Sequence, residues 1–335
     1  MKVAVLGATG LVGGRMLECL ERSSLPVDQV LPLGSERSRG RAVIFRGEEL
    51  EVLPVEERHF EGVSLALFSA GSGPSKAWAP VAASKGAVVV DNSSAWRMDP
   101  QVPLVVPEIN AADLAWHRGI VANPNCATIQ ALMVLYPLHR RYGLCYFSAV
   151  TYQSVSGTGR GAVEELKGAS AAYLAGQPWE SSVYPRDIAF NLLPHIGSFD
   201  DQGISEEEWK MVRESRKILG MPHLKVSSAT VRVPTFNCHG EAISASFEEK
   251  PDPREAREIL AGFKGVEVMD DPKGAVYPTP HDGAGRGEVL VGRIRPDTGL
   301  ENGLAMWVVA DNLLKGAALN AVQIGEALFS GGARV

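Results

Sequence analysis

The segment Asn123-Pro124-Asn125-Cys126 places a thiol where it could attack a carbonyl carbon. An apolar, strand-like run at 119–122 precedes it, and a helix-like run at 127–135 follows. A cysteine at such a junction lies in the positive field of a helix N-terminus, which favours the nucleophilic thiolate. A buried core cysteine is the alternative and is the commoner situation of a free thiol. The spacing favours the nucleophile by a small margin, so the choice between a nucleophile and a core cysteine depends on residues elsewhere in the chain.

A glycine-rich turn at the start of the chain has the pattern of a dinucleotide site. An apolar run at 2–6 leads into Gly7-Ala8-Thr9-Gly10-Leu11-Val12-Gly13, and Met16, Leu17 and Leu20 then recur at helical spacing. Glycines let the backbone approach a pyrophosphate, and the helix N-terminus offers unpaired N–H donors. The GxxGxxG spacing differs from the commoner GxGxxG, and a plain strand-to-helix turn is the alternative. The position at the start of a strand–turn–helix pattern favours the cofactor site.

The loop after the second predicted strand bears on the choice of cofactor. The strand end, at 29–33, lacks the acidic residue that usually holds the ribose of NAD. Ser35, Arg37 and Ser38 supply a cation and hydroxyl donors that suit a 2′-phosphate, so the sequence predicts NADP. Glu36 argues against this choice, and a solvated polar loop is the alternative.

Further elements complete the first half of the chain. Strands are expected at 65–68 and 87–90, with a helix at 75–84 between them. This pattern predicts a Rossmann-like dinucleotide-binding domain in which cofactors lie at the carboxyl ends of the strands. Arg97, just past one of these strand ends, is a candidate anion ligand, although an ordinary surface arginine would fit the same position.

The second half of the chain has a different pattern. Runs that alternate and are rich in β-branched residues lie at 147–157, 226–233, 241–247 and 289–294. They predict a mixed or antiparallel sheet covered on one face by helices. An amphipathic helix at 311–329 is expected to pack back on the first domain. We therefore predict an α/β protein with a discontinuous NADP-binding domain at 1–125 and 312–335, and an α+β catalytic and dimerisation domain at 126–311.

Two residues of this second half could serve one site. Arg232 lies in an apolar alternating run, where a buried guanidinium needs a charged partner. His239 follows seven residues later, and both can reach one cleft if the strand turns at Pro234. For His239 taken alone, a hydrogen-bonded structural histidine is the favoured interpretation.

Composition limits the class of protein. A chain of 335 residues with 45% apolar and 21% charged residues suits two soluble domains. Its net charge of −6 argues against a general nucleic-acid surface, and no apolar run approaches the length of a membrane helix. The 4 cysteines lack the spacing of a metal or disulfide motif. With no signal-peptide pattern at the start, we expect a cytoplasmic enzyme with reduced thiols, no metal, and neither membrane nor nucleic-acid partners.

Taken together, these segments strongly resemble the aspartate-β-semialdehyde dehydrogenase family over almost the whole chain. The resemblance rests on the order and spacing of the glycine turn, the segment before Cys126 and three further motifs: Asp91-Asn92-Ser93-Ser94-Ala95-Trp96-Arg97-Met98, Val106-Pro107-Glu108-Ile109-Asn110 and Asp311-Asn312-Leu313-Leu314-Lys315-Gly316-Ala317. It implies reversible, NADPH-dependent reduction of L-4-aspartyl phosphate to L-aspartate 4-semialdehyde with release of phosphate. It also implies a role in the biosynthesis of lysine, threonine, methionine and diaminopimelate.

The resemblance also implies roles for single residues. Cys126 would be the nucleophile that carries the thioacyl group, His239 the acid–base catalyst, and Gln153 the residue that orients the intermediate. Arg232 would bind the substrate's α-carboxylate and Glu207 its α-ammonium. The remaining implied substrate contacts, with the phosphate and beside the nucleophile, are Arg97, Lys210 and Asn125. The implied cofactor contacts are residues 9–12, Arg37, Ser38, Ser156, Gly157 and Asn312.

Charges support this assignment independently of the resemblance. One acid and three cations among these residues match in sign the ammonium, carboxylate and acyl phosphate of the substrate. Glu207 and Lys210 lie one helical turn apart on a helix-like segment at 206–219, so both can face one cleft. Without the family resemblance, an ordinary exposed i,i+3 ion pair is the favoured interpretation.

Three alternatives remain open. N-acetylglutamyl-phosphate reductases share the chemistry, but they typically have Gly before and Tyr-Pro after the nucleophile, whereas this chain has Asn125 and Ala127-Thr128. The Cys-Thr-Thr signature of glyceraldehyde-3-phosphate dehydrogenases is absent. A non-catalytic dinucleotide-binding paralogue is disfavoured because both Cys126 and His239 are present. A homodimer is the expected assembly, with a homotetramer as the alternative.

Overall fold

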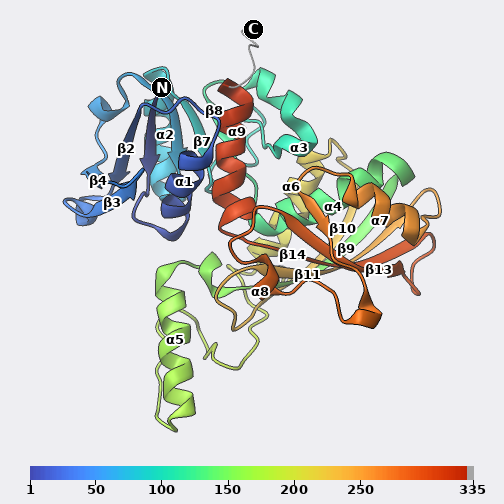
Figure 1. Cartoon of the computed structure of the whole chain (residues 1–335). Helices are drawn as coiled ribbons and strands as arrows, with labels where there is room; N and C mark the ends of the chain where they lie inside the picture. The colour runs from blue at the N-terminus through green and yellow to red at the C-terminus, as the bar shows by residue number, and fades with distance from the viewer. Residues whose placement is uncertain (330–335) are drawn as a thin grey trace. The chain divides into compact units, whose positions relative to one another are not determined.

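The computed structural model describes residues 1–329, which divide into two compact units (Figure 1). The first unit comprises residues 1–125 and the chain from 316 onward, and the second comprises residues 126–315. The chain therefore returns to the first unit four residues later than predicted, because the Asn312 side chain is hydrogen bonded inside the second unit. Residues 330–335, which the predicted first domain includes, lie outside the described residues.

The first unit contains a six-stranded parallel sheet in the order β5-β2-β1-β6-β7-β8. Its strands are β1 (Lys2–Leu6), β2 (Gln29–Gly34), β5 (Leu53–Pro54), β6 (Val63–Phe68), β7 (Val88–Asp91) and β8 (Ile120–Ala122). The other elements are α1 (Leu11–Arg22), η1 (Glu36–Ser38), β3 (Ala42–Phe45), β4 (Glu48–Glu51), η2 (Glu57–Phe60), α2 (Ser72–Ser84), α3 (Pro107–Asn110), η3 (Ala111–Trp116) and α9 (Leu319–Phe329). The predicted Rossmann-type fold is confirmed.

The last helix, α9, completes the core of the first unit. Met16 and Leu20 of α1 and Val322 and Ile324 of α9 belong to one buried apolar cluster with the central strands, and Figure 1 shows α9 beside α1. The sequence predicted one helix from 311, whereas a π-helical turn precedes α9. The helix begins late because the Asp311 carboxylate accepts bonds from the backbone N–H groups of Leu313 and Gly285, which holds this segment in the second unit.

The second unit contains a mixed six-stranded sheet in the order β10-β9-β11-β14-β13-β12, with α4, α6 and α7 on one face (Figure 1). The predicted sheet, covered on one face, is confirmed. Its strands are β9 (Leu144–Gln153), β10 (Lys225–Arg232), β11 (His239–Phe247), β12 (Val266–Val268), β13 (Val289–Pro296) and β14 (Gly303–Ala310). Its helices are α4 (Cys126–Tyr142), η4 (Val155–Gly157), α5 (Arg160–Leu174), α6 (Glu206–Ile218), α7 (Pro253–Ala261), η5 (Pro272–Gly274) and α8 (Pro280–Gly283), and the π-helical turn η6 (Leu314–Ala318) spans the boundary at which the chain passes into the first unit.

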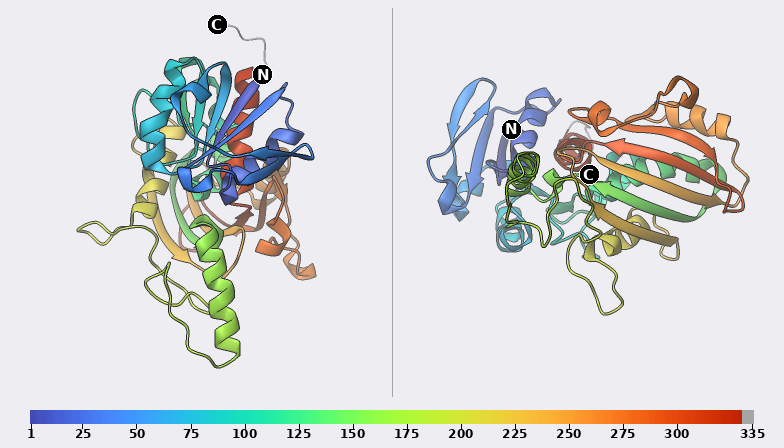
Figure 2. Two further views of the ribbon diagram at one scale, coloured as in Figure 1. Left: turned by 90° about the vertical axis from the view of Figure 1, so that its left-hand side faces the viewer. Right: turned by 90° about the horizontal axis from the view of Figure 1, so that it is seen from below.

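Strand ends in the second unit differ from the predicted ones. The alternating pattern extended β9 to Gly157, but the strand ends at Gln153 because the N–H groups of Val155 and Ser156 pair with carbonyls of a turn outside the sheet. β11 starts at His239, two residues earlier than predicted. Helix α5 was not predicted at all, and it extends away from the sheet of its own unit in Figure 1 and in the left-hand view of Figure 2.

Candidate active site

Three neighbouring strands of the second unit place polar side chains at one edge of the sheet. β10 ends at Arg232, β9 ends at Gln153, and β11 begins at His239. Gln153 is the register partner of both other residues. Directly paired residues project from the same face of a sheet, so the three side chains form a row. None of them is more than 5% exposed.

The His239 ring is held in one tautomer. The backbone N–H of Ser154 donates to Nδ1 over 3.1 Å, so the neutral ring carries its proton on Nε2. Nε2 is buried and has no hydrogen-bond partner among the described residues. Burial, and then the charge of Arg232, lowers the pKa of His239 to about 3. The ring is therefore neutral near pH 7 and directs an unused N–H donor into the site.

The amide of Asn312 joins the turn after β9 to the turn before β11. Its Oδ1 accepts from the Cys238 backbone N–H over 3.0 Å and from the Ser154 hydroxyl over 3.1 Å. Its Nδ2 donates to the Ser156 hydroxyl over 3.0 Å. Cys238 has a φ of 67°, which is strained for a residue with a side chain, and its bond to Asn312 helps to hold that conformation. The two turns that flank His239 are thus fixed to one another.

Gly157 lies against two residues of the row. A Cβ added to it would stand 3.1 Å from Nη1 of Arg232 and 3.4 Å from Cε1 of His239. A side chain here would therefore push on both. Ser156, Gly157 and Asn312, which the sequence assigns to cofactor binding, lie next to the acid–base candidate within the second unit.

Arg232 is a buried cation without a carboxylate partner among the described residues. Its Nη1 donates to the Ser154 carbonyl over 2.7 Å, while its Nε has no partner in the described chain. Burying an unpaired charge is costly, so such a group is suited to bind an anionic ligand. This geometry fits the carboxylate contact that the sequence resemblance implies.

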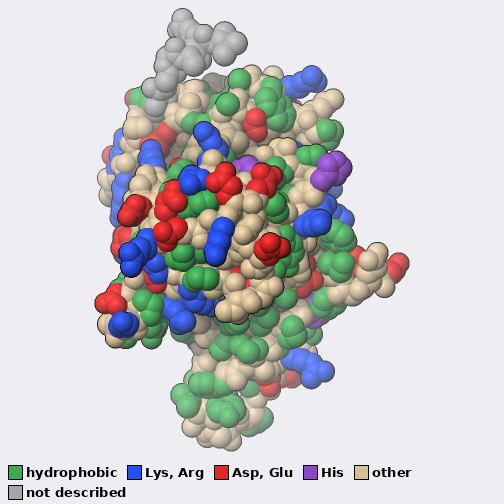
Figure 3. All heavy atoms as spheres, turned by 90° about the vertical axis from the view of Figure 1, so that its right-hand side faces the viewer, with side chains coloured by type: hydrophobic (Ala, Val, Ile, Leu, Met, Phe, Trp, Pro, Cys, Tyr) green, Lys and Arg blue, Asp and Glu red, His purple; other side chains and the backbone are tan. Residues whose placement is uncertain are grey.

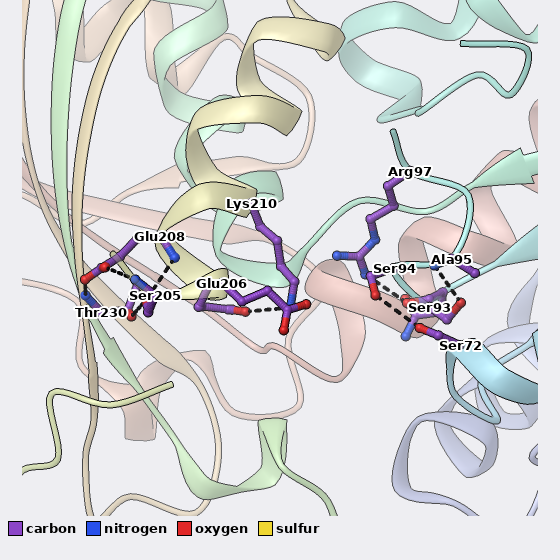
Figure 4. Close-up of polar contacts among 12 residues, drawn as sticks. Ser72, Ser93, Ser94, Ala95, Arg97, Ser205, Glu206, Glu208, Lys210 and Thr230 are labelled. Atoms are coloured by element: carbon purple, nitrogen blue, oxygen red, sulfur yellow. Dashed lines mark hydrogen bonds and ion pairs between the residues drawn. The ribbon is translucent and has the colours of Figure 1, made fainter. Parts of the chain in front are cut away.

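The start of α6 places the carboxylate of Glu207 beside Gln153 and the ammonium of Lys210 beside that carboxylate. Nε2 of Gln153 donates to Oε1 of Glu207 over 3.2 Å, and Nζ of Lys210 lies 3.1 Å from Oε2 of the same carboxylate. Nζ of Lys210 also lies 3.3 Å from Oε1 of Glu206, as Figure 4 shows. The same figure shows Ser205, the residue that caps the start of this helix. Glu207 is only 7% exposed and accepts a hydrogen bond from Gln153, so the Glu207–Lys210 pair is not an ordinary exposed ion pair.

Cys126 is the first residue of α4, as its sequence context predicted, and its side chain is half-buried. One helical turn later, Nε2 of Gln130 donates to the backbone carbonyl of His239 over 3.4 Å. The start of α4 is therefore fastened to the start of β11. The thiol candidate and the acid–base candidate stand on two elements that are joined directly.

The glycine turn of the first unit has the geometry of an anion cradle. Gly7 has a φ of +92°, and Gly10 caps α1 without a side-chain hydrogen bond, which leaves the first N–H groups of the helix open to a ligand. A Cβ added to Gly13 would clash with the Gly7 carbonyl oxygen. The Thr9 hydroxyl lies 3.4 Å from that of Ser38 and so links this turn to the loop after β2.

The loop after β2 contains Glu36, whose negative charge argued against binding of a 2′-phosphate. Arg39 donates two hydrogen bonds to the Glu36 carboxylate, of 2.7 and 3.1 Å, so the negative charge is already paired. Arg37 is exposed and forms no ion pair among residues 1–329. The loop therefore presents the Arg37 cation together with the hydroxyls of Ser35 and Ser38, which is a set that suits a 2′-phosphate.

Arg97 also belongs to the first unit, in the loop after β7. Its Nε donates to the Asn123 carbonyl and its Nη2 to the Asn92 carbonyl, each over 2.9 Å. Figure 4 shows it next to the loop in which Ser93, Ser94 and Ala95 are hydrogen bonded. Arg97 thus braces the segment that leads to Cys126, a role that the sequence did not suggest. Asn125 in that segment is only 7% exposed.

Residues 1–329 contain neither a candidate metal cluster nor a candidate membrane span. Within this range no group of three or more His, Cys, Asp or Glu residues could hold a metal ion. Over the same residues, no helix has both the length and the apolar character needed to cross a membrane.

Comparison with known proteins gives a consistent result. Family models described as the NAD binding domain and the dimerisation domain of semialdehyde dehydrogenase match residues 2–117 and 135–315. Aspartate-semialdehyde dehydrogenases of Aquifex aeolicus and Bacillus subtilis are 49% and 46% identical to the chain, covering 99% and 98% of it and 98% and 97% of their own lengths. The crystal structure of aspartate semialdehyde dehydrogenase II from Vibrio cholerae, complexed with ASA, superposes with a TM-score of 0.96 at 44% identity, covering 99% of this chain and 98% of that one.

Proposed function

Since the chain belongs to the aspartate-semialdehyde dehydrogenase family of oxidoreductases, we propose that it reduces L-4-aspartyl phosphate to L-aspartate 4-semialdehyde with NADPH, reversibly, and releases phosphate. The row of Arg232, Gln153 and His239 carries this proposal, because it sets an unpaired cation and an unused N–H donor side by side. The Vibrio cholerae relative, whose structure contains ASA, supports the choice of substrate.

The substrate's charged groups have counterparts among the site residues. Arg232 binds the α-carboxylate, and Glu207 accepts hydrogen bonds from the α-ammonium, a role that its bond to Gln153 prepares by fixing the carboxylate. Lys210 and Arg97 bind the phosphate, and Asn125 lines the approach to the thiol. Lys210 has to exchange part of its pairing with Glu206 and Glu207 for phosphate, which a partly exposed ammonium can do at little cost.

The first chemical step forms a thioester. The Cys126 thiolate attacks the acyl carbon of the phosphate anhydride, and the C–O bond to phosphate breaks with its electron pair, so phosphate leaves. The position at the N-terminus of α4 favours the thiolate. The Gln153 amide, fixed by Glu207 and Thr151, orients the carbonyl of the thioester.

The second step reduces the thioester. NADPH, when bound, supplies the hydride to the thioester carbon. The Nε2–H of the neutral His239 ring donates a hydrogen bond to the oxyanion that forms on the carbon bound to Cys126. The oxyanion then re-forms the C=O bond, the C–S bond breaks with its electron pair on sulfur, the aldehyde leaves, and Cys126 is again a thiolate.

NADP rather than NAD is proposed as the cofactor. The residues present fit it, because the glycines let the Gly7–Gly13 turn pack closely against the start of α1, where a Cβ at Gly13 would strike the Gly7 carbonyl and distort the turn. Arg37, with Ser35 and Ser38, binds the 2′-phosphate. Backbone N–H groups of residues 11 and 12 bind the pyrophosphate. We assign Ser156, Gly157 and Asn312 to the nicotinamide, and their proximity to His239 supports this assignment.

A homodimer is the proposed assembly, with a homotetramer as the alternative. Residues 135–315 match a dimerisation domain. A cavity of about 380 Å³ is lined by residues of β11, β14 and the segment before α8, among them Ala242, Tyr277 and Trp307. Figure 3 shows apolar side chains gathered at the bottom of the view, in the part of the second unit that contains α5, and Leu174 of this helix is 77% exposed. A cytoplasmic enzyme of lysine, threonine, methionine and diaminopimelate biosynthesis follows from the proposed reaction.

An assay of the purified protein in the oxidative direction tests the proposal. We expect aspartate semialdehyde to be oxidised only when phosphate and NADP are both present, with NAD a poorer cofactor. N-acetylglutamate semialdehyde serves as the competing substrate. Faster turnover of the acetylated aldehyde would contradict the substrate assignment, and turnover that does not depend on phosphate would contradict the acyl-phosphate chemistry.

A further inference from the structure

Glu241 is a completely buried acid that the proposed reaction does not use. Its side chain is 0% exposed, and neither carboxyl oxygen has a hydrogen-bond partner by distance and angle among the described residues. It forms no ion pair with a Lys or Arg of residues 1–329. Burial raises its pKa well above the usual range of a carboxyl group, and the amide of Gln130 is the polar group that opposes this shift. Complete burial without a cation beside it thus favours the protonated, neutral form of the side chain.

Its place in the sheet connects it to the active site. Glu241 follows His239 by two residues on β11, so both side chains project from the same face, the one covered by α4. Gln130 stands on α4, one helical turn after Cys126. The Glu241 side chain therefore projects from the strand that begins with the imidazole toward the helix that begins with the thiol.

The unmet hydrogen bonds of the two side chains are complementary. Gln130 uses Nε2 to donate to the His239 carbonyl, but its Oε1 has no partner within the described chain. A protonated carboxyl group has one O–H donor and needs one acceptor. Buried polar groups that stay unpaired are costly, so a small rotation that joins the Glu241 O–H to Oε1 of Gln130 is favourable.

We propose that Glu241 is a positioning residue: as a neutral acid it donates to Gln130, fixes the orientation of that amide, and so holds the start of α4 with Cys126 in register with His239. The proposal rests on the proposed function for its catalytic consequence. The link between α4 and β11 does not depend on which reaction the protein catalyses. An amide at position 241 could make the same donor contact, whereas an apolar side chain of equal length could not.

Four variants test this link: Glu241→Gln, Glu241→Met, Gln130→Met and the double methionine variant. Each is assayed for kcat and KM and for the rate at which iodoacetamide alkylates Cys126 without substrate, with the labelled peptide identified by mass. We expect Glu241→Gln to stay within about threefold of the parent in all three quantities. Each single methionine variant should lower kcat roughly tenfold with KM within about twofold, and the double variant should be no worse than the poorer single one.

Two results would overturn the proposal. Independent, multiplying effects of the two methionine substitutions would show that the side chains are not coupled. Equal damage by Glu241→Gln and Glu241→Met, with thermal unfolding unchanged, would show that the carboxyl group itself is needed. Because alkylation requires no substrate, its pattern across the variants still tests the link if the protein does not turn over aspartate semialdehyde, which would instead contradict the proposed function.

Discussion

The two units build their binding sites in opposite ways. In the first unit, one continuous turn from Gly7 to Gly13 forms the cradle almost entirely from backbone. Its shape depends on the absence of side chains at the glycines. In the second unit, side chains from separate segments meet because strand register places Arg232, Gln153 and His239 in one row. The first site should therefore fail when backbone space is filled, and the second when a single functional group is lost.

The largest effect is expected from the second site. In a His239→Asn variant the unused Nε2–H donor is absent, and one donor to a developing oxyanion is worth about 10²–10³-fold in rate. We expect kcat to fall by that factor, while Cys126 is still alkylated by iodoacetamide. The matched control is His195→Asn, in an exposed histidine, which should leave kcat unchanged. Equal losses in both variants would remove His239 from the chemistry.

The first site offers a test based on backbone space. Gly13→Ala places a Cβ against the Gly7 carbonyl, and overpacking of this kind costs roughly 1–3 kcal/mol. We expect KM for NADP and for NAD to rise together, since the shared pyrophosphate cradle is distorted. Gly14→Ala is the control, because its Cβ would meet open space inside α1 and should stabilise the helix by about 0.5–1 kcal/mol. A normal cofactor KM in Gly13→Ala would contradict the cradle.

Cofactor choice should depend on one cation of the first unit. Arg37→Ala is expected to raise KM for NADP about tenfold with little change for NAD, because a charge-assisted bond to the 2′-phosphate is lost. Arg39→Ala is the matched control, since Arg39 is already paired with Glu36. If the ratio of the two KM values stayed the same in Arg37→Ala, the assignment of the 2′-phosphate site would be wrong.

Acid sensitivity of the second unit should follow from its buried imidazole. The pKa of His239 is about 3 in the folded protein, chiefly through burial and then Arg232, with Glu207 opposing, and is near 6.5 in the unfolded chain. As pH falls through this window the unfolded chain binds a proton that the folded protein does not. Stability therefore decreases by at most about 1.4 kcal/mol per pH unit. Urea unfolding at several pH values should show a shallower acid loss for His239→Asn, and identical slopes would argue against a neutral buried ring.

Features encoded within one short segment could be predicted from the sequence. The glycine turn, the helix that starts at Cys126 and the parallel sheet of the first unit each follow from local pattern and turn chemistry. Arg232 and His239 were placed near one cleft because only a short turn separates them. For His239, however, the residue pattern alone favoured a structural role, and the family resemblance supplied the catalytic one.

Features that depend on pairing between distant segments could not be predicted. Ser154 holds the His239 ring, and Gln130 and Glu241 join α4 to β11, but none of them stands in a pattern that marks it. Their roles arise from strand register and from where α4 lies on the sheet. Likewise, nothing local revealed that Arg39 would pair with Glu36 and leave Arg37 available.

The covalent role of Cys126 is the central claim, and a single-turnover measurement tests it most directly. Enzyme is mixed with aspartate semialdehyde and NADP without phosphate, and NADPH formation and the mass of the Cys126 peptide are followed together. We predict a burst of NADPH stoichiometric with subunits and an aspartyl adduct on Cys126. When phosphate is added, the adduct should be released and turnover should resume. A Cys126→Ser variant should give neither burst nor adduct. Steady NADPH production without phosphate, or an adduct on another residue, would contradict the account.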